Sequence, residues 1–318
     1  MMKRKIVKNG TATLTVSLPA KWVKSHSLRA GDELNVIEKG AFLEVGVSQT
    51  KEIKRKTIIV NATTSTYLTI ATIAACRSGY DEIKLEIVDT EIIYKSKELT
   101  VGKNKELRFI NTLEFINILS TYFVGMEIIH QDSSKVILKN MSTYENIDFE
   151  GIYWRIADLV KEAGDSFLKS LETGSKQHYN NQSAIEFNIN KLCNYYMRCL
   201  VKSHFPNIKE DLSMYQLIGL IENSSDVYWD ILTISSKSAY TYKKGHQQIF
   251  KRTIELLNKL IRLVPKGTPQ ELLDFYHKLK EFILPLNQSP EPDAIIIELK
   301  RILIQMKEII HYAVMKNI

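Results

Sequence analysis

Apolar and polar residues alternate near the start of the chain, which is the pattern of half-buried strands. Residues 13–18 alternate between a hydroxyl and an apolar side chain, and Asn9-Gly10 before them is a strong hairpin signal. A second alternation runs through residues 34–45. Between the two, Pro19 suits the first position of a short helix. The first 50 residues therefore predict two hairpins and one short helix.

The next stretch mixes short apolar strands with two helical segments. Its pattern predicts strands at 57–60 and 83–87, helices at 65–76 and 109–123, and a hairpin over 125–138. Gly102 stands apart from any glycine-rich phosphate-binding motif. We expect a small α+β connector domain over residues 51–145, after an N-terminal domain over residues 1–50.

From residue 152 onward apolar residues recur every three or four positions, as on the buried face of a helix. The last segment is the clearest, since apolar residues from Ile295 to Ala313 follow the spacing of a bundle seam. Turn signals divide the region into six helices, with breaks at Gly174-Ser175, around Pro206, near Gly245, at Gly267-Thr268-Pro269 and at Pro290 to Pro292. An all-helical domain is therefore expected over residues 146–318, with the stripes forming its core.

The positive charge is concentrated at the N-terminus. Residues 1–60 hold twelve Lys or Arg and five Asp or Glu, which accounts for the whole formal charge of +7. This asymmetry is typical of a nucleic-acid-binding module on a neutral body, and a solvated basic surface is the alternative. No apolar run reaches the roughly 18 residues of a membrane span, and no apolar run follows the basic start as in a secretory signal. We expect a cytoplasmic protein without membrane insertion.

The chain lacks the sequence signs of catalysis. Its seven histidines include no pair at the spacing of a metalloprotease, and the nucleophile-elbow and phosphate-loop motifs do not occur. The three cysteines fit neither a metal knuckle nor a redox pair, so we expect reduced, partly buried thiols. The sequence predicts a protein that is not an enzyme.

The N-terminal motifs resemble a known domain. Asn9-Gly10, then Leu14 to Trp22, then Leu28 to Leu34 are similar to the AbrB-type swapped-hairpin domain. A unit of about 45 residues has too little core to fold alone, so we expect a homodimer. The resemblance implies a swapped-hairpin β-barrel dimer that binds DNA. Contacts with DNA phosphates are expected from Lys3, Arg4, Lys5, Lys8, Lys21 and Lys24.

The third predicted helix of the C-terminal region carries a second motif. Glu222, Asp226 and Asp230 recur every four residues, so they share one helix face. With six helices, this resembles the PhoU family of phosphate-uptake regulators, which implies two three-helix bundles that hold metal ions at such carboxylates. The resemblance implies a divalent or ferric ion at Glu222, Asp226 and Asp230, with Glu186 from the preceding helix. A solvated acidic face is the alternative.

The sixth predicted helix departs from that family. Lys300 and Ile304 stand where a second acidic motif is expected, so at most one metal site is predicted.

The order of the parts resembles an archaeal fusion of an AbrB-type start, an α+β middle and a PhoU-type end. It implies a multidomain α+β protein that binds DNA and regulates transcription, in phosphate uptake or homeostasis. The alternative is an adaptor that contacts a phosphate transporter ATPase or another signalling protein, with the basic module serving only to dimerise.

Overall fold

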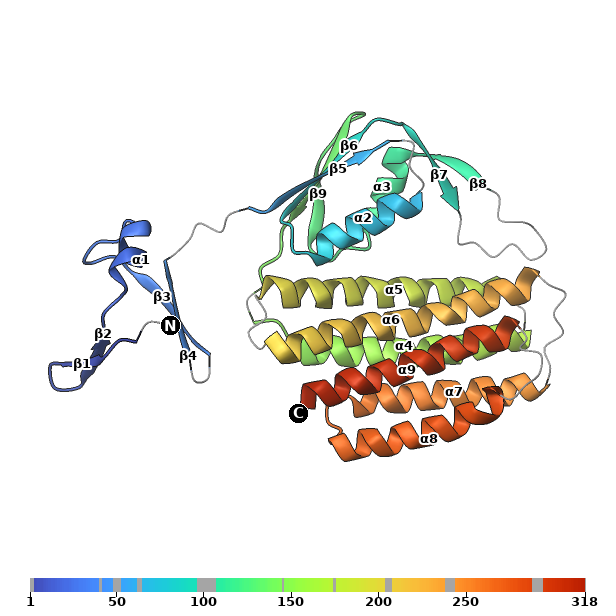
Figure 1. The fold of residues 1–318 in the computed structure, drawn as a ribbon. Coiled ribbons are helices and arrows are strands. Elements are labelled where there is room, and N and C mark those ends of the chain that lie inside the picture. Colours follow the sequence, from blue (N-terminus) through green and yellow to red (C-terminus); the bar gives the residue numbers. More distant parts are fainter. Residues whose placement is uncertain are drawn as a thin grey trace. The chain divides into compact units, whose positions relative to one another are not determined.

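A computed structural model shows a mixed α+β protein whose C-terminal part is helical (Figure 1). It describes residues 3–39, 42–47, 53–61, 65–95, 107–144, 146–173, 176–203, 208–237, 244–287 and 294–317. The chain divides into two compact units, Met1–Glu52 and Ile53–Ile318. We call the first the N-terminal unit. The second contains an α+β part (residues 53–144) and a helical part (residues 146–317).

The N-terminal unit contains the two predicted hairpins. Strands β1 (Ile6–Asn9) and β2 (Thr13–Val16) pair antiparallel, and Gly10 takes a φ of 75° at the turn between them. The short helix α1 (Ala20–Ser25) follows, and then β3 (Leu34–Lys39) pairs with β4 (Phe42–Val47). Each hairpin is a separate two-stranded sheet, and the described residues form no closed barrel in the single chain.

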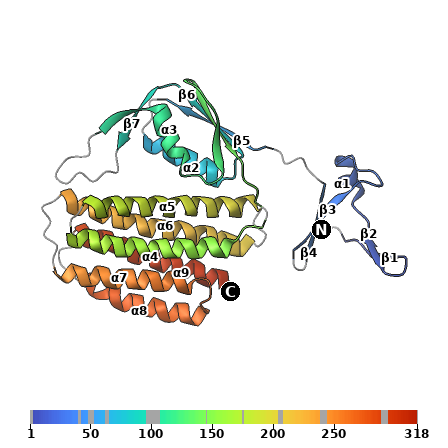
Figure 2. The same cartoon turned by 180° about the vertical axis from the view of Figure 1, so that it is seen from behind.

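The α+β part is built on a four-stranded sheet in the order β5-β6-β10-β9. Helix α2 (Ser65–Arg77) connects the parallel strands β5 (Arg55–Val60) and β6 (Glu82–Ile87), as in a βαβ unit. Strands β9 (Met126–Gln131) and β10 (Lys135–Asn140) form the predicted hairpin. The face of the sheet that carries α2 and α3 (Thr112–Ser120) holds the core of this part (Figures 1 and 2).

One predicted helix is only partly correct. The segment 109–123 begins as strand β8 (Leu107–Asn111), which pairs with β7 (Glu91–Lys95), and helix α3 starts at Thr112. Asn111 caps this helix, since its side chain accepts hydrogen bonds from the amides of Leu113 and Glu114. Over a few residues the apolar pattern fits a helix and a strand equally well, and the pairing with β7 decides in favour of the strand β8.

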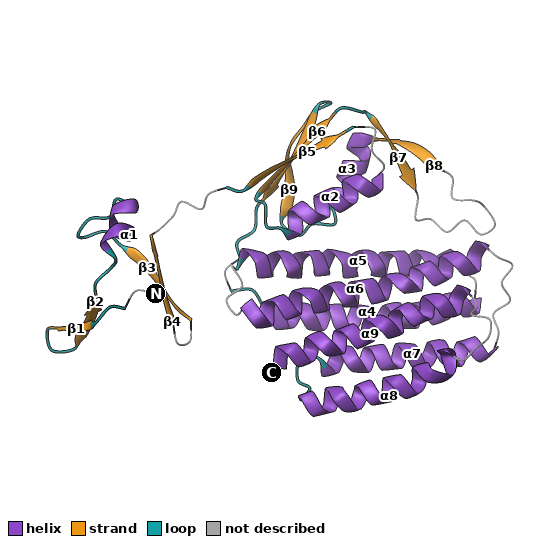
Figure 3. Ribbon diagram, viewed as in Figure 1, coloured by secondary structure: helices purple, strands orange, loops and turns teal. Residues whose placement is uncertain are grey.

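One predicted break, at Gly267-Thr268-Pro269, falls within the described residues of the helical part and separates two helices (Figure 3). Gly245 lies in the first turn of a helix, and the predicted breaks at 174–175, 206 and 290–292 lie outside the described residues. The described residues of the helical part form α4 (Phe149–Thr173), α5 (Lys176–Lys202), α6 (Ile208–Lys237), α7 (Lys244–Leu263), α8 (Pro269–Asn287) and α9 (Ala294–Asn317). The apolar seam of α9 is buried as predicted, from Ile295 to Ala313. These helices share one continuous hydrophobic core. None of the described helices is long and apolar enough to cross a membrane.

Candidate functional site

The six predicted DNA-contacting side chains all lie on the surface of the N-terminal unit. Lys3, Arg4 and Lys5 precede β1, Lys8 lies on β1, and Lys21 and Lys24 lie three positions apart on α1. All six are exposed, so their ammonium and guanidinium groups are accessible to an anionic partner.

The same unit exposes much of its apolar surface. All residues of β1 and β2 are exposed, including Ile6 at 69% and Leu14 at 68%. Val36 and Leu43 on the second hairpin are also exposed. Among the side chains described in residues 3–47, none is buried. The described side chains of a single copy therefore form no buried hydrophobic core.

The predicted metal ligands lie on α5 and α6, and two of them bind arginines. Arg77 of α2 donates to both carboxylate oxygens of Glu222, at 2.9 and 2.7 Å. Arg301 of α9 donates to Asp230 at 2.9 Å. Glu186 is buried and Asp226 is half-buried. Among the described residues, no three His, Cys, Asp or Glu side chains gather closely enough to hold a metal ion.

Two of these carboxylates, Glu222 and Asp230, are already paired with arginines that a metal at the same oxygens would have to compete with. Arg77 donates one hydrogen bond to each oxygen of Glu222, which leaves fewer lone pairs on that carboxylate for a metal. Asp226 also lies near the buried thiol of Cys193. Burial raises the pKa of this thiol well above its ordinary value, and the carboxylates of Glu222 and Asp226 raise it further, whereas Arg77 lowers it. Metal binding at this helix stays a prediction.

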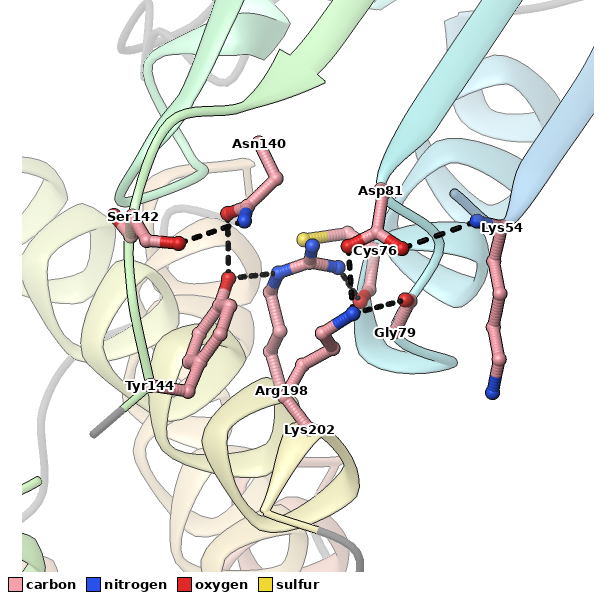
Figure 4. Close-up of polar contacts among 9 residues, drawn as sticks. All are labelled: Lys54, Cys76, Gly79, Asp81, Asn140, Ser142, Tyr144, Arg198 and Lys202. Atoms are coloured by element: carbon pink, nitrogen blue, oxygen red, sulfur yellow. Dashed lines mark hydrogen bonds and ion pairs between the residues drawn. The ribbon is translucent and has the colours of Figure 1, made fainter. Parts of the chain in front are cut away.

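A polar network between the α+β part and α5 was not found by sequence reasoning. Arg198 of α5 is completely buried. Its Nε donates to the hydroxyl of Tyr144 at 2.5 Å, and its Nη1 donates to the carbonyl of Cys76 at 2.7 Å (Figure 4). The Tyr144 hydroxyl in turn donates to Asn140 at 2.7 Å. A buried arginine of the helical part is thus held by two oxygens of the α+β part.

Lys202, one turn further along α5, forms the second half of this network. Its Nζ lies 2.6 Å from the Asp81 carboxylate, which also accepts a hydrogen bond from the Lys54 amide at 3.1 Å (Figure 4). Burial acts to raise the pKa of Asp81, but the hydrogen bonds from Lys202 and Lys54 outweigh it and lower that pKa. Asp81 is therefore held as a carboxylate.

Arg77 completes the contacts between the two parts. Besides Glu222, it donates through Nε to Asn194 of α5 at 2.7 Å. Arg77, Arg198 and Lys202 thus connect α2 and the turn after it to α5 and α6. One feature of the sequence could have indicated this buried arginine, because Arg198 interrupts an otherwise apolar and aromatic stretch of α5. All three cysteines are free and buried in the same helices or near them.

Comparisons of the chain with protein-family models, curated proteins and solved structures gave no significant match.

Proposed function

We propose that this chain is a DNA-binding regulator of transcription, which binds DNA through a dimer of its N-terminal unit. The α+β and helical parts would sense a signal or dock on a partner. The likeness of the N-terminal motifs to AbrB-type domains and of the helices to the PhoU family supports this, and it points to phosphate uptake or homeostasis as the regulated process.

The observation that carries the proposal is the combination of exposed apolar strands and exposed basic side chains in one small unit. The hairpins expose Ile6, Leu14 and Leu43, and a second copy of the unit is the partner that would complete their core. A two-fold dimer would also present each basic side chain twice. Twelve such groups on a small dimer would form a strongly positive surface for the DNA backbone.

The salt dependence of DNA binding by the full chain tests this proposal. A dimer that makes about six phosphate contacts loses on the order of a thousandfold in affinity between about 50 and 200 mM salt. Lys5→Ala or Lys24→Ala removes one contact per protomer and should lower the slope of log affinity against log salt by roughly two units. Fluorescence anisotropy with duplex DNA measures this slope.

Lys259→Ala is the matched control, because Lys259 is exposed on α7 of the helical part. It should leave the slope unchanged. If the slope follows Lys259 rather than Lys5 and Lys24, or if the chain binds no DNA at about 50 mM salt, the regulator proposal fails. An adaptor that acts through protein contacts, with the N-terminal unit serving to dimerise, then takes its place.

A further inference from the structure

A cavity of about 260 Å³ lies between the α+β part and the helical part. One wall is apolar and comes from α2, α3 and the turn after α3, with Ile70, Ile73, Phe115, Ile118, Leu119 and Tyr122. Ile70 and Ile118 are 62% and 42% exposed, so apolar side chains reach the solvent beside the cavity. An apolar wall with a few polar groups opposite is typical of small-molecule sites, and this cavity is smaller than the usual range of about 300–1,000 Å³.

The polar side of the cavity offers hydrogen-bond acceptors. Asn190 Oδ1 is shielded from solvent and accepts no hydrogen bond from the described residues. Thr69 Oγ1 donates its only proton to the carbonyl of Ser65 at 2.8 Å, which leaves its lone pairs for another group. The Glu222 carboxylate is an acceptor, and Arg77 fixes its position through two hydrogen bonds. A buried acceptor without a donor calls for a ligand or a water that donates.

We propose that this cavity binds a small amphipathic amine. Its apolar body would lie against Phe115, Leu119 and their neighbours, and its ammonium group would donate to Asn190 Oδ1, Thr69 Oγ1 and the Glu222 carboxylate. An ammonium has three donors and no acceptor, which matches Asn190 Oδ1, Thr69 Oγ1 and Glu222, whereas a carboxylate would be repelled by the Glu222 carboxylate and would receive no proton from Asn190 Oδ1 or Thr69 Oγ1.

The position of the cavity would let such a ligand stabilise the packing of the two parts against each other. Its walls belong to α2 and α3 on one side and to α5 and α6 on the other. A ligand that contacts both sides would bind the docked arrangement in preference to any other and would therefore stabilise it. The inference stands independently of DNA binding, since it concerns the second unit alone.

Calorimetric titration of the full chain with two matched probes tests the inference. The probe 2-phenylethylamine carries the ammonium, and phenylacetate carries a carboxylate on a similar aromatic body. We expect the amine to bind saturably with one site per chain, and phenylacetate to bind at least about tenfold more weakly. Thr69→Val keeps the side-chain shape but removes an acceptor, so it should raise the Kd of the amine about three- to tenfold.

Ile118→Trp should fill the cavity and abolish amine binding, whereas Ile129→Trp is the control. Ile129 is 49% exposed on β9, against 42% for Ile118, and it does not line the cavity. The inference is overturned if phenylacetate binds as tightly as the amine, if the amine shows no saturable binding at millimolar concentration, or if binding survives Ile118→Trp. If circular dichroism shows that Ile118→Trp is unfolded, Thr69→Val decides: an unchanged Kd of the amine in that variant overturns the inference.

Discussion

The ion pair between Arg77 and Glu222 should couple the α+β part to the helical part energetically. The closest nitrogen–oxygen distance is 2.7 Å, and the side chains are only 22% and 13% exposed. Arg77→Met leaves a mostly buried carboxylate without its guanidinium, and Glu222→Gln leaves the guanidinium beside a neutral amide. Removing both partners leaves no uncompensated charge, so the double variant should be less destabilised than the two single variants together.

The size of this coupling follows from burial. Breaking a fully buried pair costs about 3–5 kcal/mol, and the remaining solvent exposure reduces this to about 2–3 kcal/mol for Arg77→Met. Glu222→Gln keeps the shape and one acceptor, so about 1–2 kcal/mol is expected. The double variant should lose about 2–3 kcal/mol in all, which gives a coupling energy of about 1–2 kcal/mol.

Urea unfolding of the four proteins, followed by circular dichroism of the helices, measures the coupling. The pair Arg262–Asp158 is the control, because its distance is also 2.7 Å but its side chains are 48% and 57% exposed. Solvent screening should limit that coupling to below about 1 kcal/mol. Additive effects of Arg77→Met and Glu222→Gln would refute the reasoning. If Glu222 is instead a metal ligand, added divalent metal should stabilise the wild type and Arg77→Met but not Glu222→Gln.

Three further outcomes are expected. The folded-state pKa of Asp81 is lowered, so its ion pair with Lys202 stabilises the protein above the unfolded pKa of about 3.9 and is lost as the pH falls through the folded value. Urea unfolding should therefore show Asp81→Asn less stable than wild type at pH 7, with the gap closing in acid; a gap independent of pH would contradict this. Arg198→Met removes two hydrogen bonds of a buried guanidinium and should lower the free energy of unfolding by about 1–3 kcal/mol in the same assay. The surface control Arg252→Met should lower it by less than about 0.5 kcal/mol. If the proposed dimer forms through the hairpins, Leu14→Asp should give a monomer in light scattering where the wild type gives a dimer, and a variant that is still dimeric would exclude the hairpins as the interface.

Local patterns were enough to predict most elements. The seam from Ile295 to Ala313 repeats with the period of a helix, and such a stripe is stable only when it is buried. Asn9-Gly10 specifies a tight turn because Gly10 adopts a positive φ at little cost. Gly267-Thr268-Pro269 likewise predicted the break between α7 and α8. In each case the information lies within a few residues of the element it determines.

Contacts between distant residues were decided only by the tertiary structure. Strand β8 replaces the start of a predicted helix because β7 pairs with it. Arg77 and Glu222 are 145 positions apart, and Arg198 and Cys76 are 122 apart. The four-residue spacing of Glu222, Asp226 and Asp230 is the same whether Glu222 binds a metal, faces solvent or pairs with Arg77. Helix periodicity determines which face a side chain is on, whereas the packing of α2 against α5 determines what that face meets.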